Sequence, residues 1–357
     1  MGPEVAVVNA MLSHYSTPFF LGHPMWKTVL VLIFTAALCG CQKSPSRESG
    51  QEGAAQPRKI TIAYTDQPQS TLIHVALAKG YFAREGLEIQ SLKYSYGKEA
   101  LQSLIEGKAD LASVAETPIM FQVLKGEKIC VIANVEASGL NNAIIARKDA
   151  GISGPGDLKG KRIGFTSGTT SDFFLDSFLT SAGLTRQAIR PVALNSAEML
   201  DAVIGKKVDA VCTWNYTLAK IKRRLGADVT IFSDPVIYTE TFNIAAQQNF
   251  VRNNPETVQS FLRALIRAEA FVAKHTDESQ SIMSAATKTD LSLVREVWNS
   301  FQYRVVLDKR LLLTLEDETR WAMKNKLTDQ TVIPDYRKYI HLDSLRAVKP
   351  EAVKADR

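Results

Sequence analysis

The chain has 357 residues, a formal net charge of +6 at pH 7 and 45% hydrophobic residues. This length and apolar content can fill one large core or two medium ones, which excludes a chain that is disordered throughout. The one basic cluster, Lys220, Lys222, Arg223 and Arg224, lies at the end of a predicted helix, where positive charge complements the helix dipole. Nucleic-acid binding is therefore not indicated, because the sequence has no basic stripe.

The N-terminal segment has the pattern of an export signal. A positive start at Lys27 is followed by an uncharged run, residues 28–38, with the sequence TVLVLIFTAAL. That run is shorter than the ~20 residues that span a bilayer, so residues 25–40 are predicted to be a lipoprotein signal peptide. The ending LCGC has the form of a lipobox, which predicts diacylation of Cys41 and a membrane-anchored protein in the periplasm or at the cell surface. An ordinary secretory signal that is cleaved off is the open alternative.

Two stretches flank this signal. Residues 1–24 contain no Lys or Arg and three Pro residues, so we interpret them as a mis-assigned upstream start. Residues 41–57 are small, polar and Pro-containing, which predicts a flexible tether. Globular structure is expected from residue 58 onward.

From there the pattern alternates between short apolar runs and helical periodicity. The first series has predicted strands at 59–65, 87–94, 109–115 and 128–135, with helices at 71–82, 98–106 and 117–124. The second series has strands at 141–148, 161–167, 189–195, 208–214 and 228–234, with helices within 167–184, 197–206 and 215–226. A strand at 241–247 follows, and then helices at 255–274, 291–301 and 311–324. Such alternation predicts an α/β fold with largely parallel sheets covered by helices.

The two series suggest two lobes joined by extended crossings near residues 140–146 and 239–245. Lobe 1 would comprise residues 58–142 plus 243–357, and lobe 2 residues 143–242. Such an arrangement leaves a cleft between the lobes that can close by hinge motion.

Candidate ligand-binding residues follow from the rule that ligands sit beyond the carboxyl ends of parallel strands. The loops at those ends supply Asp66, Gln67, Tyr96, Glu116, Thr117, Ser167, Thr169, Thr170, Ser171, Trp214 and Asn215, and the returning crossing supplies Glu240. Trp214 and Tyr96 could equally stack on a ligand or pack between the lobes.

The sharpest local signal is the segment from Ser167 to Asp172, where a strand ends and a turn of small residues opens a helix. Free backbone N–H groups and Ser and Thr hydroxyls there suit an oxyanion. Plain helix capping, with Thr169 as N-cap and Asp172 three residues on, is the alternative.

The acidic candidates complicate a purely anionic ligand. Glu116, Glu240 and Asp66 would repel an anion in a small pocket, so a zwitterion or a nitrogen heterocycle fits better. Solvated rim charges are the alternative for all three.

Metal, cofactor and catalytic signatures are missing from the sequence. Cys130 and Cys212 lie in apolar runs placed in different lobes, which predicts buried free thiols. The five His residues are dispersed, no HExxH or CxxC occurs, and GxSxG is absent, so neither a metal, a cofactor nor a hydrolase is expected.

Five segments, in this order, resemble the periplasmic binding proteins for nitrate, taurine, aliphatic sulfonates and thiamine precursors. They are residues 78–89 (AKGYFAREGLEI), 106–118 (EGKADLASVAETP), 157–184, 205–214 (GKKVDAVCTW) and 250–268. The resemblance spans about residues 58 to 325. It implies a type II periplasmic-binding-protein fold with ligand held between two α/β lobes, and no enzymatic activity. As partners it implies a small-molecule ligand and the permease and ATPase of an ABC importer, with the binding protein expected to be a monomer.

Two alternatives remain beside that expectation. The same lobes could feed a membrane receptor as a sensor subunit. One eukaryotic branch resembling this family makes a thiamine pyrimidine, but it depends on a cysteine-rich motif that this sequence lacks.

Overall fold

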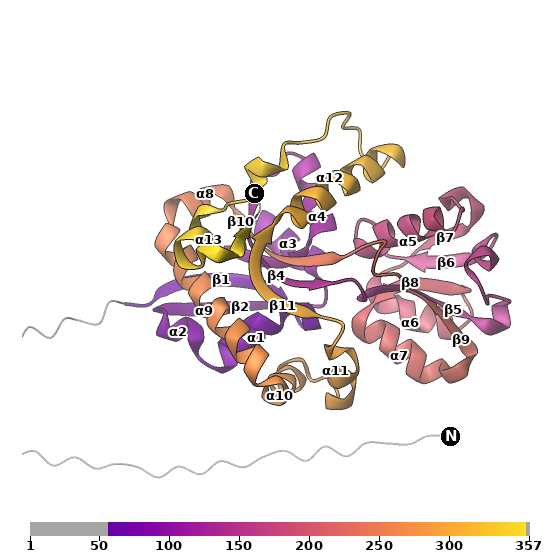
Figure 1. The fold of residues 1–357 in the computed structure, drawn as a ribbon, viewed down its shortest axis with the longest axis horizontal. Coiled ribbons are helices and arrows are strands. Elements are labelled where there is room, and N and C mark those ends of the chain that lie inside the picture. The colour runs from indigo at the N-terminus through magenta and orange to yellow at the C-terminus, as the bar shows by residue number, and fades with distance from the viewer. Residues whose placement is uncertain (1–55, 355–357) are drawn as a thin grey trace, which may run out of the picture. The chain divides into compact units, whose positions relative to one another are not determined.

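Two mixed β-sheets organise residues 56–354, the part of the chain that the computed structural model describes (Figure 1). Both sheets belong to one compact unit of the chain. The predicted signal peptide and its lipidation site, Cys41, lie outside the described residues. Within them, no helix is long and apolar enough to cross a membrane.

The first sheet has the strand order β12-β11-β4-β10-β3-β1-β2. Its strands are β1 (Arg58–Thr65), β2 (Leu87–Tyr94), β3 (Leu111–Ala115), β4 (Ile129–Ser138), β10 (Glu240–Gln247), β11 (Gln302–Asp308) and β12 (Val353–Lys354). All residues of β4 are buried, as expected for a central strand covered on both faces.

The prediction of a largely parallel first sheet is wrong at its centre. Strand β10 lies antiparallel between β3 and β4, and β11 is antiparallel to β4. The reason for β10 is the chain path: it enters from the second sheet, at the edge where β1 and β3 end, and so runs in the opposite direction. Strand β11 was not predicted: residues 302–308 lie between the predicted helices at 291–301 and 311–324, and no strand was expected there.

The second sheet has the order β7-β6-β8-β5-β9. Its strands are β5 (Asn142–Arg147), β6 (Arg162–Phe165), β7 (Arg190–Ala193), β8 (Ala210–Trp214) and β9 (Val229–Phe232). Strand β6 is parallel to β7 and β8, whereas β5 is antiparallel to β8 and β9.

Helices cover both sheets. They are α1 (Thr71–Ala78), α2 (Tyr81–Arg84), α3 (Gly97–Ile105), α4 (Glu116–Leu124), α5 (Thr170–Ser181), α6 (Met199–Ile204), α7 (Asn215–Leu225), α8 (Gln248–Asn253), α9 (Pro255–Lys274), α10 (Thr276–Thr287), α11 (Leu291–Trp298), α12 (Lys309–Lys324) and α13 (Asp343–Val348). The single helix predicted at 71–82 is two helices, because Gly80 adopts a left-handed conformation (φ 66°) between α1 and α2.

The two-residue period of a strand explains how the second sheet is packed. Neighbouring residues of β5 point to opposite faces, so Ile144 joins one core with α5 and Ile145 joins another with α6 and α7. Figure 1 shows α5 on one side of this sheet and α6 and α7 on the other.

Two short connections join the sheets, residues 139–141 between β4 and β5 and residues 233–239 between β9 and β10. They pack against each other at Gly139, where an added Cβ would lie 2.9 Å from the Cβ of Pro235. The two crossings therefore contact each other closely and form one pair.

The cysteine prediction is confirmed, because Cys130 and Cys212 are both buried free thiols. Each lies on a central strand, β4 and β8 respectively, in different sheets. Within the described range, no group of side chains is arranged to hold a metal ion.

Candidate ligand-binding site

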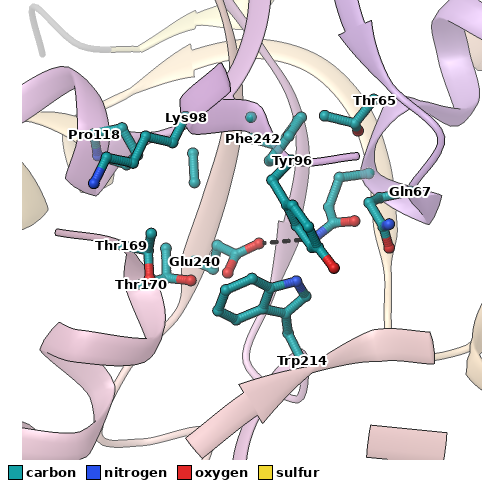
Figure 2. A pocket seen from close by; sticks show the side chains of 13 residues that line it. Thr65, Gln67, Tyr96, Lys98, Pro118, Thr169, Thr170, Trp214, Glu240 and Phe242 are labelled. Carbon is teal, nitrogen blue, oxygen red and sulfur yellow. Dashed lines mark hydrogen bonds between the residues drawn. The ribbon is translucent and has the colours of Figure 1, made fainter. Parts of the chain in front are cut away.

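A small cavity lies where loops from both sheets meet (Figure 2). Its lining consists of Thr65, Gln67, Gln69, Tyr96, Gly97, Lys98, Ala115, Pro118, Thr169, Thr170, Trp214, Glu240 and Phe242. The cavity has a volume of about 40 Å³, which is room for only a few water molecules.

The lining residues come together because strands end at this edge. Thr65 ends β1, Ala115 ends β3 and Trp214 ends β8, while Glu240 begins the returning strand β10. Gly97 allows the start of α3 to approach β3, since a Cβ at this position would lie 3.0 Å from the Cα of Val114. The sheet edge therefore presents polar and aromatic side chains to one space.

Six of the predicted residues line this cavity. They are Gln67, Tyr96, Thr169, Thr170, Trp214 and Glu240. Ser167 lines an adjoining recess, where its carbonyl accepts a hydrogen bond of 3.0 Å from Lys98 Nζ. This contact joins α3 of the first lobe to the loop after β6 of the second.

The other predicted residues do not line the cavity. The Ser171 hydroxyl donates to the carbonyl of Cys212 at 2.7 Å, and Thr117 donates to the buried carboxyl of Glu318. Asn215 donates to the Oε1 of Gln69, a lining residue, at 3.4 Å. These side chains hold neighbouring elements in place.

Among the acidic candidates, Asp66 is 40% exposed at the side chain and lies 4.0 Å from Lys93 Nζ, which fits a rim charge. The rim interpretation is wrong for Glu116 and Glu240, because both are buried, with exposed fractions of 0% and 1%. Of the two, only Glu240 reaches the cavity lining.

Thr169 occupies the N-cap position of α5, as the capping alternative expected, but its side chain does not cap the helix. The Thr169 hydroxyl donates instead to the carbonyl of Thr166 at 2.6 Å. Asp172 accepts from the backbone N–H of Gly168 at 2.9 Å, so it braces the loop before the helix.

Glu240 is held by side-chain amides from the first crossing, from the start of β5 and from the first lobe. Its Oε1 accepts from Asn141 at 2.8 Å and from Gln69 at 3.2 Å, and its Oε2 accepts from Asn142 at 2.7 Å. Burial raises the pKa of Glu240, and these donors oppose that rise. Within residues 56–354 no Lys, Arg or His lies within 4.0 Å of its carboxylate oxygens to neutralise it.

Further buried acids surround Glu240. The pKa of Glu116 is raised to about 8, first by burial and then by the charge of Glu240. Burial also raises the pKa values of Glu136 and Glu318, which are both fully buried. Of these four carboxyl groups, only that of Glu240 belongs to the cavity lining.

Two aromatic rings, one from each lobe, close one side of the cavity. The ring centroids of Tyr96 and Trp214 are 6.0 Å apart with an interplanar angle of 79°, an edge-to-face pair. Lys98 lines the cavity as well, and burial, followed by the ammonium of Lys125, lowers its pKa.

Several residues of the site were not among the predicted ligand-binding residues. They are Gln69, Lys98, Asn141, Asn142 and Phe242. Gln69 and Lys98 lie in or beside loops that had been nominated, so the strand-end rule already pointed to them. Asn141 ends the first crossing and Asn142 begins β5, and only their position opposite Glu240 reveals their role.

A chain of hydrogen bonds links the cavity loop to α12 of the first lobe. Trp321 Nε1 donates to Asp176 at 2.8 Å across the lobes, and Arg186 donates to both Asp176 and Asp172 at 2.6 Å. Asp172 in turn accepts from Gly168. The lobes are thus joined beside the cavity as well as through the crossings.

Comparison with known proteins agrees with this architecture. A formylaminopyrimidine-binding protein of Halalkalibacterium halodurans is 20% identical over 279 residues, 76% of this chain and 82% of that protein. A candidate binding protein of Brucella abortus is 25% identical over 235 residues, 65% of this chain and 72% of its own. The crystal structure of the periplasmic aliphatic sulphonate binding protein of Escherichia coli matches with a TM-score of 0.70 and 20% identity, over 80% of this chain and 97% of that one.

The likeness to the solved structure confirms the predicted periplasmic-binding-protein fold. The family described as NMT1/THI5 like matches residues 67–279, more than half of the sequence. The five segments singled out in the sequence lie largely within that range, and the family expected from them is confirmed: the chain belongs to the NMT1/THI5-like family.

Proposed function

We propose that this protein is the extracytoplasmic solute-binding component of an ABC importer, which captures a small molecule between its lobes and performs no chemistry on it. The observation that carries the proposal is the cavity itself, because its lining is drawn from loops of both sheets, with both crossings beside it. The relatives named for formylaminopyrimidine and for aliphatic sulphonate are binding proteins, which supports the same function.

The lobes that move would be residues 58–142 plus 243–357 and residues 143–242, with the paired crossings as hinge. Ligand contact is assigned to the six predicted residues that line the cavity, together with Gln69 and Lys98. Asp66, Glu116, Thr117, Ser167, Ser171 and Asn215 would act by positioning that lining.

Anchoring through a diacylated Cys41 is part of the proposal and concerns a residue outside the described range. Two acyl chains would hold the protein at the membrane as a monomer beside its permease. A Cys41→Ser variant expressed in its host should appear in the soluble fraction, and a variant that still sediments with membranes would contradict the anchor.

The test of the function is ligand-induced stabilisation and closure. Thermal unfolding would be followed against sulfonates, nitrate, amino acids and pyrimidines, because a ligand that binds only the folded state raises the melting temperature. Small-angle scattering on the same samples should show a smaller radius of gyration with the stabilising ligand.

The matched variant is Thr169→Ala combined with Thr170→Ala, which removes two hydroxyls from the lining. It should weaken binding without loss of fold. An unchanged melting temperature across the whole panel, with no small molecule retained in native mass spectrometry, would contradict a solute-binding function.

A further inference from the structure

The carboxylate of Glu240 is the starting point, because it is buried, lines the cavity and has no cationic partner within the described residues. Buried charges in proteins are normally paired, since the cost of removing them from water is otherwise large. Amide donors from Gln69, Asn141 and Asn142 orient this carboxylate but do not neutralise it. Lys98, the cationic residue of the lining, donates to the Ser167 carbonyl and makes no ion pair with Glu240, so this carboxylate has no contacting cation within the described residues.

The neighbouring carboxyl groups do not remove the need for that charge. Glu116 accepts from the hydroxyls of Tyr238 and Thr241, groups that can also accept from a protonated acid. Glu116 also accepts from the backbone N–H of Thr241. Glu240 accepts from the hydroxyl of Thr170 and from three side-chain amides, so it has more partners that can only donate and that favour an ionised acceptor. The proton of this closely spaced pair therefore resides on Glu116, and the charge on Glu240.

The rings of Tyr96 and Trp214 strengthen a preference for a positive group at the same place. Figure 2 shows Glu240 beside these two rings. Aromatic faces attract ammonium and protonated ring nitrogens, and the attraction grows where water is excluded. Both rings line the cavity together with Glu240, so one cationic group could contact all three.

Lys98 offers the opposite charge. In Figure 2 it lies beside Pro118, and Glu240 lies between it and Tyr96. Lys98 Nζ makes one hydrogen bond, to the carbonyl of Ser167, and an ammonium has three N–H groups. The hydroxyl-bearing residues Thr169 and Thr170, at the start of the twelve-residue helix α5, line the same cavity. An anionic group there would meet an ammonium and the positive end of a helix, while the two hydroxyls are already engaged with the Thr166 carbonyl and with Glu240.

We propose that the ligand of this site is a small zwitterion, with a cationic nitrogen against Glu240, Tyr96 and Trp214 and an anionic group towards Lys98 and Thr169. This inference rests on the proposed solute-binding function and adds the charge pattern of the ligand. Glu240 then sets specificity, because a simple anion of the same size would place no positive charge beside a buried carboxylate.

The test has two steps: capture of the ligand, and then binding measurements on variants that each remove one charge. Purified protein would be incubated with a low-molecular-weight extract of a bacterial culture, and the retained molecule identified by native mass spectrometry. A retained molecule with both a basic nitrogen and an acidic group supports the proposal. A retained anion without a basic nitrogen, such as an alkanesulfonate or nitrate, overturns it and leaves the solute-binding function standing. Retention of nothing would contradict that function, and the inference would fall with it.

Calorimetry with the retained molecule then tests the residues. Glu240→Gln should weaken binding at least about tenfold, because it removes one half of a desolvated charge pair. Lys98→Met should weaken binding about two- to fivefold, because Lys98 is exposed and its charge is screened by water. Glu88→Gln and Lys59→Met are the controls, since both residues are exposed at the starts of β2 and β1, the ends of these strands away from the cavity. They should bind like the unaltered protein.

A second variant covers the case in which Glu240→Gln fails to fold. Trp214→Leu leaves the carboxylate in place, removes the aromatic face and should weaken binding about fivefold or more. Unchanged affinity in folded Glu240→Gln or in Trp214→Leu would overturn the proposal.

Discussion

At the scale of single residues, the buried acids give the protein a distinctive response to pH. Glu116 has an ordinary pKa of 4.5, raised to about 8 in the fold by burial and by Glu240. A raised carboxyl pKa means that the folded state binds the proton more tightly than the unfolded state. The stability that Glu116 contributes is therefore present at acidic pH and is lost as pH rises from about 4.5 through about 8.

We expect the melting temperature to fall between pH 6.5 and pH 8.5, in a window that lies above the titration of His74. Burial lowers the pKa of His74 to about 4, so this residue costs stability only as pH falls below 6.5. Glu116→Gln should make the alkaline decline shallower, by roughly 2–4 °C over the window. Thermal unfolding at several pH values measures the slope, and the exposed Glu99→Gln variant should leave it unchanged. A decline of equal steepness in Glu116→Gln would show that Glu116 is ionised in the fold.

At the scale of elements, the contact between the two crossings depends on a glycine. An added methyl at Gly139 would meet Pro235 Cβ at 2.9 Å and its Cα at 3.2 Å, so the crossings would have to separate. We expect Gly139→Ala to lower the free energy of unfolding by about 1–3 kcal/mol, the usual cost of overpacking. Gly156→Ala is the matched control, because nothing lies within 4 Å of a Cβ there. Urea unfolding measures the free energy of unfolding of both variants. Equal values would show that the two crossings can move apart without cost.

Some strands could be predicted from the local sequence pattern, and others could not. Strands β4 and β8 each begin with an apolar run, residues 129–133 and 210–212, so residue type alone predicted them. Strand β11 has a weaker pattern, with only Val305 and Leu307 buried, and it exists because it pairs with β4 some 160 residues earlier in the chain. A pairing over that separation leaves little trace in a local window.

At the scale of the whole molecule, the hydrogen bond from Trp321 to Asp176 joins the lobes beside the cavity. If the site closes on its ligand, this bond must break before the ligand leaves. Trp321→Phe keeps most of the packing against Phe121 and Phe173 but removes the donor. We expect ligand dissociation to become about 3–10 times faster, with little change in association, because one buried hydrogen bond is worth about 1 kcal/mol.

Stopped-flow fluorescence would measure both rates. Trp298→Phe is the control, since Trp298 is also buried but packs within the first lobe against Tyr303. Equal dissociation rates in the unaltered protein and in Trp321→Phe would show that this hydrogen bond does not hold the lobes closed on the ligand.

By itself, the sequence determined the α/β alternation, the family and the loops from which the site is built, because strand ends, glycines and polar turns are local features. It also determined that Cys130 and Cys212 would be buried thiols. Only the tertiary structure decided which of the nominated side chains share one cavity: Glu240 faces it, whereas Glu116 is enclosed behind it. Burial and the absence of a cationic partner arise from elements far apart in the chain, and no local pattern records them. For that reason the charge of Glu240, on which the proposed ligand preference depends, became visible only in the fold.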